Sequence, residues 1–261
     1  MTREEVRAFM TGESPGFARA RRILRLVPSS PRCKLCAAPF GGLGALALKP
    51  AGFGRSPGNP ALCMKCMVEL RKKGLRGVEI PVTLLFSDIR GSTAMGEHMH
   101  PEEFYAFLEH FYRLAADAIF AHNGVVDKVV GDEVIGLFFG GISGPNHAGA
   151  GIAAGLGLAS LAARADASPS GPIPAGTAVH TGEAFVGATG PADTVNDFTA
   201  LGDVVNATAR LASTARAGEL IVSAAAAEAA GTSVDGIERR TVEIRGRTQP
   251  IDVLVLRPSE P

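Results

Sequence analysis

The sequence has no tryptophan, only two tyrosines and no excess of either charge. Its 26 basic residues are balanced by 26 acidic residues, so the composition gives no support to a nucleic-acid footprint or to an anionic membrane surface as partner. The scarcity of aromatic rings also removes the stacking surface that a zinc-ribbon nucleic-acid protein would use. We therefore expect no nucleic-acid partner.

Long apolar runs are missing as well. No run approaches the roughly 18 to 20 residues of a membrane span, and the segment after Met1 lacks the apolar stretch of a signal peptide. We expect no membrane span and a cytoplasmic location, where the four cysteines would stay reduced unless they hold a metal. The length of 261 residues allows one sizeable core plus an appendage.

The cysteines form two C-x-x-C pairs, Cys33 with Cys36 and Cys63 with Cys66, separated by 26 residues rich in glycine and proline. Four thiolates at about 2.3 Å suit a structural tetrahedral Zn²⁺, and the ion would stabilise a segment too poor in core residues to fold alone. An iron–sulfur cluster uses the same ligands, and a redox dithiol pair is a further alternative. Helical spacing over 67–73 favours a treble-clef-like arrangement. We predict a helical segment of two short helices over 1–30, then a four-cysteine metal-binding module and linker over 31–77.

Two apolar segments place carboxylates at their ends. The stretch 82–93, VTLLFSDIRGST, reads as a buried strand that ends on Asp88, and 124–139 reads as a hairpin with Asp132 at its turn. Paired carboxylates on rigid strand ends suit Mg²⁺, which fills its remaining positions with water and phosphate oxygens. Hairpin turns also favour aspartate for conformational reasons, which is the alternative for Asp132 alone.

The rest of the chain reads as alternating helices and strands. A core-facing amphipathic helix is expected from Pro101 to the Asn-Gly pair at 123–124, and an alanine- and glycine-rich helix over 146–165. Strands are expected over 175–180 and 184–188, with a turn at 181–183 between them. His180 ends the first of these strands, and we interpret it as structural rather than catalytic.

A second group of polar residues lies in the segment 196–212, NDFTALGDVVNATARLA. Asn206 and Arg210 are spaced i, i+4 on a predicted helix, so both can reach one ligand. A guanidinium near a transferring phosphoryl group stabilises charge in the transition state. The alternative is a helix capped at Asp203 with a surface arginine.

Together these motifs resemble the class III nucleotidyl cyclases. The resemblance covers about residues 80–256 and rests on LFSDIRGST, DKVVGDEVIGLF, AVHTGEAFVG, LGDVVNATARL and IRGRTQPIDVLVL in this order. It implies a catalytic domain over 78–258 with an α+β, ferredoxin-like fold, an antiparallel-rich sheet with helices on one side. The small N-terminal zinc-binding module with its four cysteines lies outside the resemblance.

The resemblance also implies roles for single residues. Asp88 and Asp132, with the carbonyl of Ile89, would hold two Mg²⁺ or Mn²⁺ ions per active site. The substrate and transition-state roles fall on purine-selecting Lys128, its partner Thr199, ribose-orienting Asn206, transition-state Arg210 and triphosphate-binding Arg245, where the family has a lysine. Family members are head-to-tail dimers, so a homodimer with two shared active sites is implied.

The implied reaction converts ATP to 3′,5′-cyclic AMP and pyrophosphate. Lysine can donate to N1 of adenine, whereas guanine presents N1–H and N2–H donors that a lysine leaves unpaired, at about 1 to 3 kcal/mol each. ATP is therefore the expected substrate. The alternatives are a guanylate cyclase and a non-catalytic nucleotide-binding regulatory module, although such a module would be expected to have lost a carboxylate or the arginine.

Overall fold

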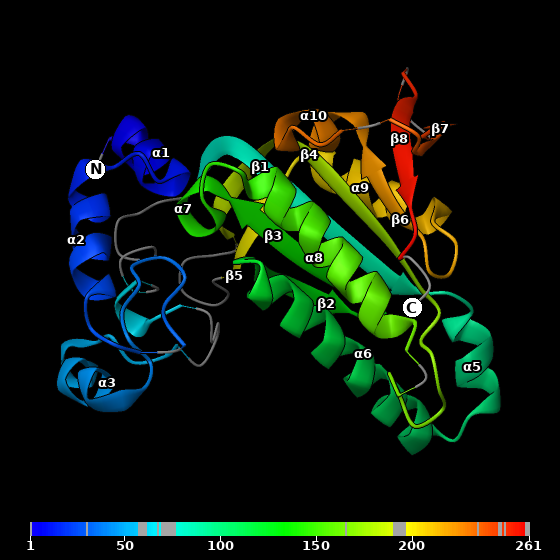
Figure 1. Ribbon diagram of the computed structural model, residues 1–261, viewed down its shortest axis with the longest axis horizontal. Coiled ribbons are helices and arrows are strands. Elements are labelled where there is room, and N and C mark those ends of the chain that lie inside the picture. The colour runs from blue at the N-terminus through cyan, green and yellow to red at the C-terminus, as the bar shows by residue number, and fades with distance from the viewer. Residues whose placement is uncertain are drawn as a thin grey trace. The chain divides into compact units, whose positions relative to one another are not determined.

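The computed structural model of the protein describes residues 2–29, 31–56, 62–66, 68, 77–164, 166–189, 197–233, 235–244, 247 and 249–258. Figure 1 shows its helices and strands. The helices are α1 (Arg3–Thr11), α2 (Pro15–Arg25), α3 (Gly42–Leu48), η1 (Lys49–Ala51), α5 (Ser92–His98), α6 (Pro101–Ala121), α7 (Gly140–Ser143), α8 (His147–Ala162), α9 (Asp203–Thr214) and α10 (Ala224–Ala230). The strands are β1 (Val78–Ile89), β2 (Val125–Val130), β3 (Glu133–Phe139), β4 (Ala175–Thr189), β5 (Asp197–Leu201), β6 (Leu220–Ser223), β7 (Glu238–Val242) and β8 (Ile251–Leu256).

The eight strands of the described residues belong to one sheet with the order β2-β3-β1-β4-β6-β8-β7, and β5 pairs with β4 beside this path. The pairs β2–β3, β4–β5, β6–β8 and β7–β8 are antiparallel, whereas β4–β6 is parallel. A mixed sheet that carries helices confirms the expected α+β fold class.

Two predicted elements that position the carboxylates are confirmed. β1 is buried along most of its length and ends at Ile89, immediately after Asp88. The 124–139 hairpin forms as β2 and β3, and its turn contains Gly131 at φ +58°, a left-handed backbone conformation that glycine adopts without steric cost. Both carboxylates are therefore held at the ends of regular, hydrogen-bonded elements.

The main core lies between the sheet and α6, α8 and α10. Its fully buried members include Leu85 of β1, Phe111 of α6, Phe138 of β3 and Leu158 of α8. α6 begins at Pro101 and α8 begins after Asn146, whose side chain caps the helix by accepting from the N–H of Gly149. Both helices match the predictions to within three residues, and Figure 1 shows them side by side in front of the sheet.

The prediction for residues 175–188 is wrong. The structure has one strand, β4, where the sequence pattern indicated two strands and a turn at 181–183. Its first half pairs with β6 through Thr177–Val179, and its second half pairs with β5 through Phe185–Thr189. Thr181 stays in the strand and its hydroxyl is 2.7 Å from the hydroxyl of Thr83, so this polar side chain in mid-strand finds its partner on a neighbouring strand instead of in a turn.

By its contacts the chain divides into two compact units. The first contains Met1–Pro81, Phe139–Pro145 and Glu183–Leu201, and the second contains Val82–Phe138, Asn146–Gly182 and Gly202–Pro261. The predicted boundaries at 30 and 77 stay predictions. The expected helix at 67–73 and most of the linker at 71–77 lie outside the described residues, while 64–66 are helical.

Within the first unit, α1 packs closely on α7. Val6 and Met10 of α1 are buried, and a Cβ added to Gly141 would lie only 2.5 Å from the carbonyl oxygen of Met10. The two short N-terminal helices that the sequence predicts are both present as α1 and α2. The glycines of α7 thus permit the N-terminal helix to approach its backbone.

Candidate active site and metal centre

Asp88 and Asp132 lie close enough to affect each other's ionisation. The Asp88 side chain is 28% exposed at the end of β1, and Asp132 is half-buried in the β2–β3 turn. Burial first, and then the hydrogen bond to Asp132, raise the pKa of Asp88 to about 6. Burial alone would also raise the pKa of Asp132, but hydrogen bonds from Ser92 and Asp88 lower it. Two converging carboxyl groups that share a hydrogen bond are the arrangement that a divalent cation can occupy.

Sequence reasoning missed Arg90 as part of this site. Its Nη2 is 2.6 Å from Oδ2 of Asp88, and its Nη1 donates to the carbonyl of Ser213 at the end of α9, at 3.2 Å. Its Nε has no hydrogen-bond partner among the described residues. The signal was the basic residue two positions after Asp88 in SDIRGST. Arg90 supplies the positive charge that balances the carboxyl pair.

The donor set around Asp88 fits a hard divalent cation. Two carboxylates converge, one from β1 and one from the β2–β3 turn, and Ile89, whose carbonyl is the expected third ligand, is 2% exposed at the end of β1. Oxygen donors without sulfur or imidazole suit Mg²⁺ or Mn²⁺ rather than softer metals. The residues present therefore fit the ions that the sequence predicts.

Asn206 and Arg210 lie on the exposed face of α9, one turn apart as predicted. The opposite face buries Val204, Ala207, Thr208, Leu211 and Ala212. The alternative interpretation placed a helix cap at Asp203, but Gly202 is the N-cap, and Asp203 forms an ion pair with Arg247 at 3.1 Å. α9 thus offers an amide and a guanidinium to a ligand from one stable surface.

The three expected substrate-binding residues differ in how far the structure describes them. Lys128 lies on β2, with its Nζ 3.9 Å from Oδ2 of Asp127, whose side chain is almost fully buried. Thr199 is 2% exposed on β5, where it pairs with Gly187. Arg245 lies outside the described residues. Lys128 belongs to the second compact unit and Thr199 to the first.

His180 occupies a structural position. It is 8% exposed, and its Nδ1 is 2.8 Å from Oγ of Ser223, which also caps α10 by accepting from the N–H of Ala226. Burial, with a smaller contribution from nearby Arg247, lowers the pKa of His180 to about 4, so the ring is neutral at neutral pH. We interpret this histidine as a structural link between β4 and the start of α10.

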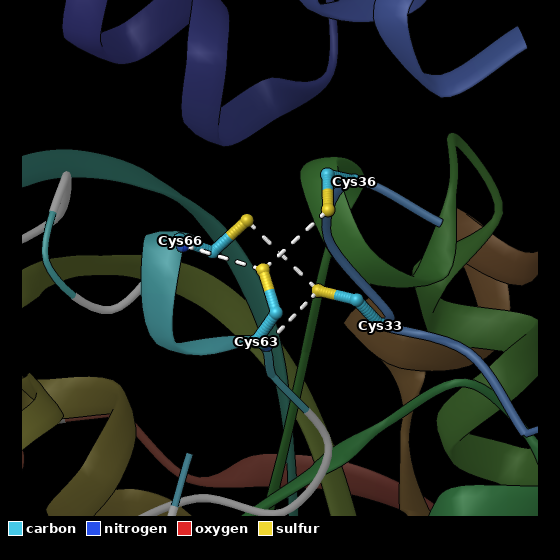
Figure 2. Close-up of side chains that lie close together, drawn as sticks. All are labelled: Cys33, Cys36, Cys63 and Cys66. Carbon is cyan, nitrogen blue, oxygen red and sulfur yellow. Dashed lines mark hydrogen bonds between the residues drawn. The ribbon is translucent and has the colours of Figure 1, made fainter. Parts of the chain in front are cut away.

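The four cysteines converge on one point, as Figure 2 shows. All four are buried, and their sulfur atoms lie within 4.8 Å of one another. The Sγ distances are 3.9 Å for Cys33–Cys66 and 3.6 Å for Cys36–Cys63. Four sulfurs at about 2.3 Å from a tetrahedral ion are about 3.8 Å apart, so these distances match the edges of such a tetrahedron.

Backbone N–H groups support the cysteine cluster. The N–H of Cys63 donates to Sγ of Cys33 at 3.2 Å, and the N–H of Cys66 donates to Sγ of Cys63 at 3.4 Å. Ala37, next to Cys36, has φ +64°, which is uncommon for a residue other than glycine and turns the chain back after the first pair. The segment is therefore shaped to present four thiolates to one ion.

Comparison with known proteins agrees with the geometry of the carboxylate site. The family model described as the adenylate and guanylate cyclase catalytic domain matches residues 79–257. The chain belongs to the class III adenylate and guanylate cyclase family. The cyclase domain covers every predicted catalytic residue, while the four cysteines precede it.

Relatives of this cyclase chain include both adenylate and guanylate cyclases. The structure of the guanylyl cyclase Cya2 matches with a TM-score of 0.64 and 30% identity, over 72% of this chain and 97% of that protein. The adenylyl cyclase CyaB from P. aeruginosa matches with a TM-score of 0.62 and 25% identity, over 71% and 98%. Adenylate cyclase 1 of Rhizobium meliloti is 31% identical over 136 residues, which are 50% of this chain and 20% of that protein.

An uncharacterised protein of Mycobacterium tuberculosis is 30% identical over 207 residues, which cover 76% of this chain. The matched region is 36% of that relative's length, so the cyclase chain corresponds to about a third of it. None of the helices in the described ranges combines the length and the apolar character needed to cross a lipid bilayer.

Proposed function

We propose that the protein is an adenylate cyclase that converts ATP to 3′,5′-cyclic AMP and pyrophosphate. The observation that carries the proposal is the convergence of Asp88 and Asp132 at the ends of buried elements, in a chain that also keeps Asn206 and Arg210 on the open face of α9. The 3′-oxygen of ribose would attack the α-phosphorus, and the bond to pyrophosphate would break.

Each protein group in the proposal has a distinct task. Asp88, Asp132 and the carbonyl of Ile89 would hold two Mg²⁺ or Mn²⁺ ions, which when bound lower the pKa of the 3′-hydroxyl and neutralise the triphosphate. Asn206 would orient the ribose by hydrogen bonds, and Arg210 would stabilise the negative charge that grows on the phosphoryl oxygens. Arg245 would bind the triphosphate through its guanidinium.

The preference for ATP rests on Lys128 and Thr199. An ammonium group donates to N1 of adenine, whereas N1–H of guanine would face it as a second donor. The guanylyl cyclase activity named for the structural relative Cya2 makes GTP the second candidate substrate. A purely regulatory nucleotide-binding module is the third candidate, and the retention of both carboxylates with Asn206 and Arg210 speaks against it.

The proposed active enzyme is a head-to-tail homodimer with two shared sites. One chain would supply Asp88 and Asp132, and its partner would supply Lys128, Thr199, Asn206 and Arg210. Because a single chain carries both sets, two copies complete two equivalent sites.

We also propose that Cys33, Cys36, Cys63 and Cys66 hold one structural Zn²⁺. The sulfur separations match the edges of a zinc tetrahedron, and all four side chains are buried. An iron–sulfur cluster is the competing occupant, because it also accepts four thiolates.

The function is tested with purified protein, ATP or GTP, and Mg²⁺ or Mn²⁺, by measuring cyclic nucleotide and pyrophosphate. We expect cyclic AMP as the main product. Lys128→Glu should lower turnover of ATP at least about tenfold, because the hydrogen-bond donor to the base is lost. The control is Lys49→Glu, which reverses the charge of an exposed lysine outside the cyclase domain and should leave turnover unchanged. Equal ATP turnover in Lys128→Glu would contradict the substrate assignment, and no product with either nucleotide would contradict the enzyme assignment.

A further inference from the structure

The neutral total charge conceals a separation of charge along the chain. Residues 1–77 contain 15 of the 26 basic residues but only 4 of the 26 acidic ones, a formal charge of +11. Residues 78–261 contain the other 11 basic and 22 acidic residues, a formal charge of −11. A Zn²⁺ held by four thiolates would add −2 to the first part and leave it at +9. The N-terminal part is thus strongly basic even though the chain is neutral.

One face of α2 combines this basic charge with exposed aliphatic side chains. Arg19, Arg22, Ile23 and Leu26 follow the spacing i, i+3, i+4 and i+7, which places them on one side of the helix. All four are exposed, Ile23 by 64% and Leu26 by 78%. Large aliphatic side chains rarely stay this exposed beside one another unless they meet a partner.

A second exposed apolar face lies on α3. Leu43 is 87% exposed and Leu46 is 76% exposed, three residues apart on the same side of the helix. The two helices are neighbours, because the Cγ1 atom of Val27, just after α2, occupies the space that a side chain on Gly44 of α3 would need. Figure 1 shows both helices in the N-terminal part of the chain. We call the exposed residues Arg19, Arg22, Ile23, Leu26, Leu43 and Leu46 the basic-apolar face.

We propose that the basic-apolar face docks the N-terminal part on the surface of an anionic lipid bilayer. Arginines would pair with lipid phosphates, and the four aliphatic side chains would enter the boundary between headgroups and acyl chains. This is peripheral binding, which needs no membrane-spanning helix. It does not rest on the proposed cyclase activity.

The exposed side chains favour lipid over nucleic acid. A nucleic-acid surface of similar charge would present aromatic rings for stacking or polar groups for base edges, whereas the large exposed hydrophobic side chains that the structure describes on α2 and α3 are isoleucine and leucine. Aliphatic side chains beside arginines match a surface that is anionic outside and apolar beneath it.

The test is sedimentation of the full, zinc-loaded chain with vesicles of phosphatidylcholine alone or with about 30% phosphatidylglycerol. We expect binding to the anionic vesicles only, and release at about 0.5 M NaCl because salt screens the arginines. Arg22→Glu should weaken binding roughly fivefold or more, from a contribution of about one basic residue near the surface. Arg113→Glu, the same charge reversal at an exposed position of α6, should leave binding unchanged.

The apolar contribution is tested separately. Leu43→Asp with Leu46→Asp should lower binding at least about tenfold without unfolding the protein, because both side chains are exposed. Tyr105→Asp, at a 61% exposed position of α6, is the matched control.

Several results would overturn the proposal. Equal binding to neutral and anionic vesicles, or full binding by Arg22→Glu, would remove the electrostatic component. Binding of single-stranded RNA with no vesicle binding would assign the charge to nucleic acid. A lower oligomeric mass of the Leu43→Asp, Leu46→Asp variant in solution would assign the face to a second copy of the chain.

Discussion

Asp132 and Asp88 bring two carboxyl groups together, and the fold tolerates this because a hydrogen bond and Arg90 compensate. Replacing Asp132 by Asn should therefore cost little stability, within about 1 kcal/mol, since one of two like charges is removed. Turnover should fall at least about a hundredfold, because a ligand of the divalent ions is lost. Thermal unfolding measures the change in stability, and production of cyclic nucleotide measures the change in turnover.

The control for this substitution is Asp117→Asn, at an exposed position of α6. It changes charge by the same amount and should preserve turnover. Substantial activity in Asp132→Asn would contradict the assignment of the metal ligands.

For single residues, the sequence predicts which side chains lie at strand ends but not which side chains contact each other. Asp88 and Asp132 could be predicted because each follows or interrupts an apolar strand pattern. The ion pair of Arg90 with Asp88 could not, since it depends on the side-chain conformation and on the nearness of Ser213, more than a hundred residues away in the sequence. The buried hydrogen bond between His180 and Ser223 could not be predicted for the same reason, because the two residues are far apart in the sequence.

Among the elements, α8 depends on small residues at particular positions. A Cβ on Gly151 would lie 2.7 Å from Cγ2 of Thr83, whereas a Cβ on Gly157 of the same helix would meet Cε1 of His122 at an ordinary 3.6 Å. Gly151→Ala should therefore lower the free energy of unfolding by about 1–3 kcal/mol, because Thr83 is fixed by hydrogen bonds to His147 and Thr181.

Gly157→Ala provides the matched comparison and should raise the free energy of unfolding by about 0.5–1 kcal/mol, because alanine favours the helix and meets no clash. Denaturant titration of both variants gives the two values. Equal changes in the free energy of unfolding at the two positions would show that helix propensity, and not the contact of α8 with β1, determines the effect of these substitutions.

The strands β7 and β8 are tied to the start of β6 through Glu219. This carboxylate is 2% exposed and accepts hydrogen bonds from Arg240 at 2.8 and 2.9 Å and from Arg257 at 2.7 Å. The bonds from Arg240 are the main cause that lowers the pKa of Glu219 to about 2. Because the pKa in the folded state is below the usual 4.5, the stabilisation is complete above about pH 4.5 and is lost as the pH falls towards 2.

Glu219→Gln should therefore reduce the free energy of unfolding by about 2 kcal/mol at pH 7, and the difference from the unmodified protein should shrink as the pH falls from 4.5. Denaturant titrations at several pH values measure it. Glu97→Gln, at an exposed position, is the control. A pH-independent difference would mean that the two arginines stabilise the fold through packing alone.

The error at β4 shows what a pattern of single residues misses. Polar residues in mid-strand resemble a turn, but here the strand changes its neighbour from β6 to β5 at that point, and Thr181 pairs with Thr83. Helices such as α6 were predictable because their apolar period is long and their ends carry proline and glycine signals. Partner exchange within one strand leaves no such local signal.

At the scale of the whole molecule, the proposed dimer with shared active sites predicts that two inactive variants can restore activity when they are mixed. Asp88→Ala and Arg210→Ala should each be inactive, but an equal mixture with free subunit exchange should recover about a quarter of full activity. Half of its dimers would be mixed, and each would have one intact site. Mixing Asp88→Ala with Asp132→Ala should recover nothing, because both defects lie in the same half of the site.

The mixture is assayed for cyclic nucleotide after subunit exchange has been demonstrated by mass. An inactive mixture of Asp88→Ala and Arg210→Ala would then contradict the shared-site dimer.

The convergence of the four cysteines could be predicted from the two C-x-x-C pairs, and the structure brings their sulfur atoms within 4.8 Å of one another. Which metal they would hold does not follow from the sequence, because zinc and an iron–sulfur cluster use the same thiolates. We expect about one zinc per chain, a colourless protein, and loss of order over residues 32–66 on chelation while the cyclase domain stays folded. Elemental analysis, absorption spectra and hydrogen exchange measure these. Cys63→Ser should lose the metal. A brown, iron-containing protein would contradict the zinc assignment and favour an iron–sulfur cluster. Metal-free protein with free thiols and an unchanged fold would contradict both metal assignments.

Arg90 connects Asp88, a predicted metal ligand, with the helix that carries two further predicted site residues. It pairs with Asp88 and donates to the carbonyl of Ser213, at the end of the helix that carries Asn206 and Arg210. In a head-to-tail dimer Asp88 and α9 serve different sites, so a change in the pairing of Asp88 at one site alters the support of α9 at the other. For the proposed dimer we therefore expect cooperative binding at the two sites, with a coupling free energy that is equal in both directions.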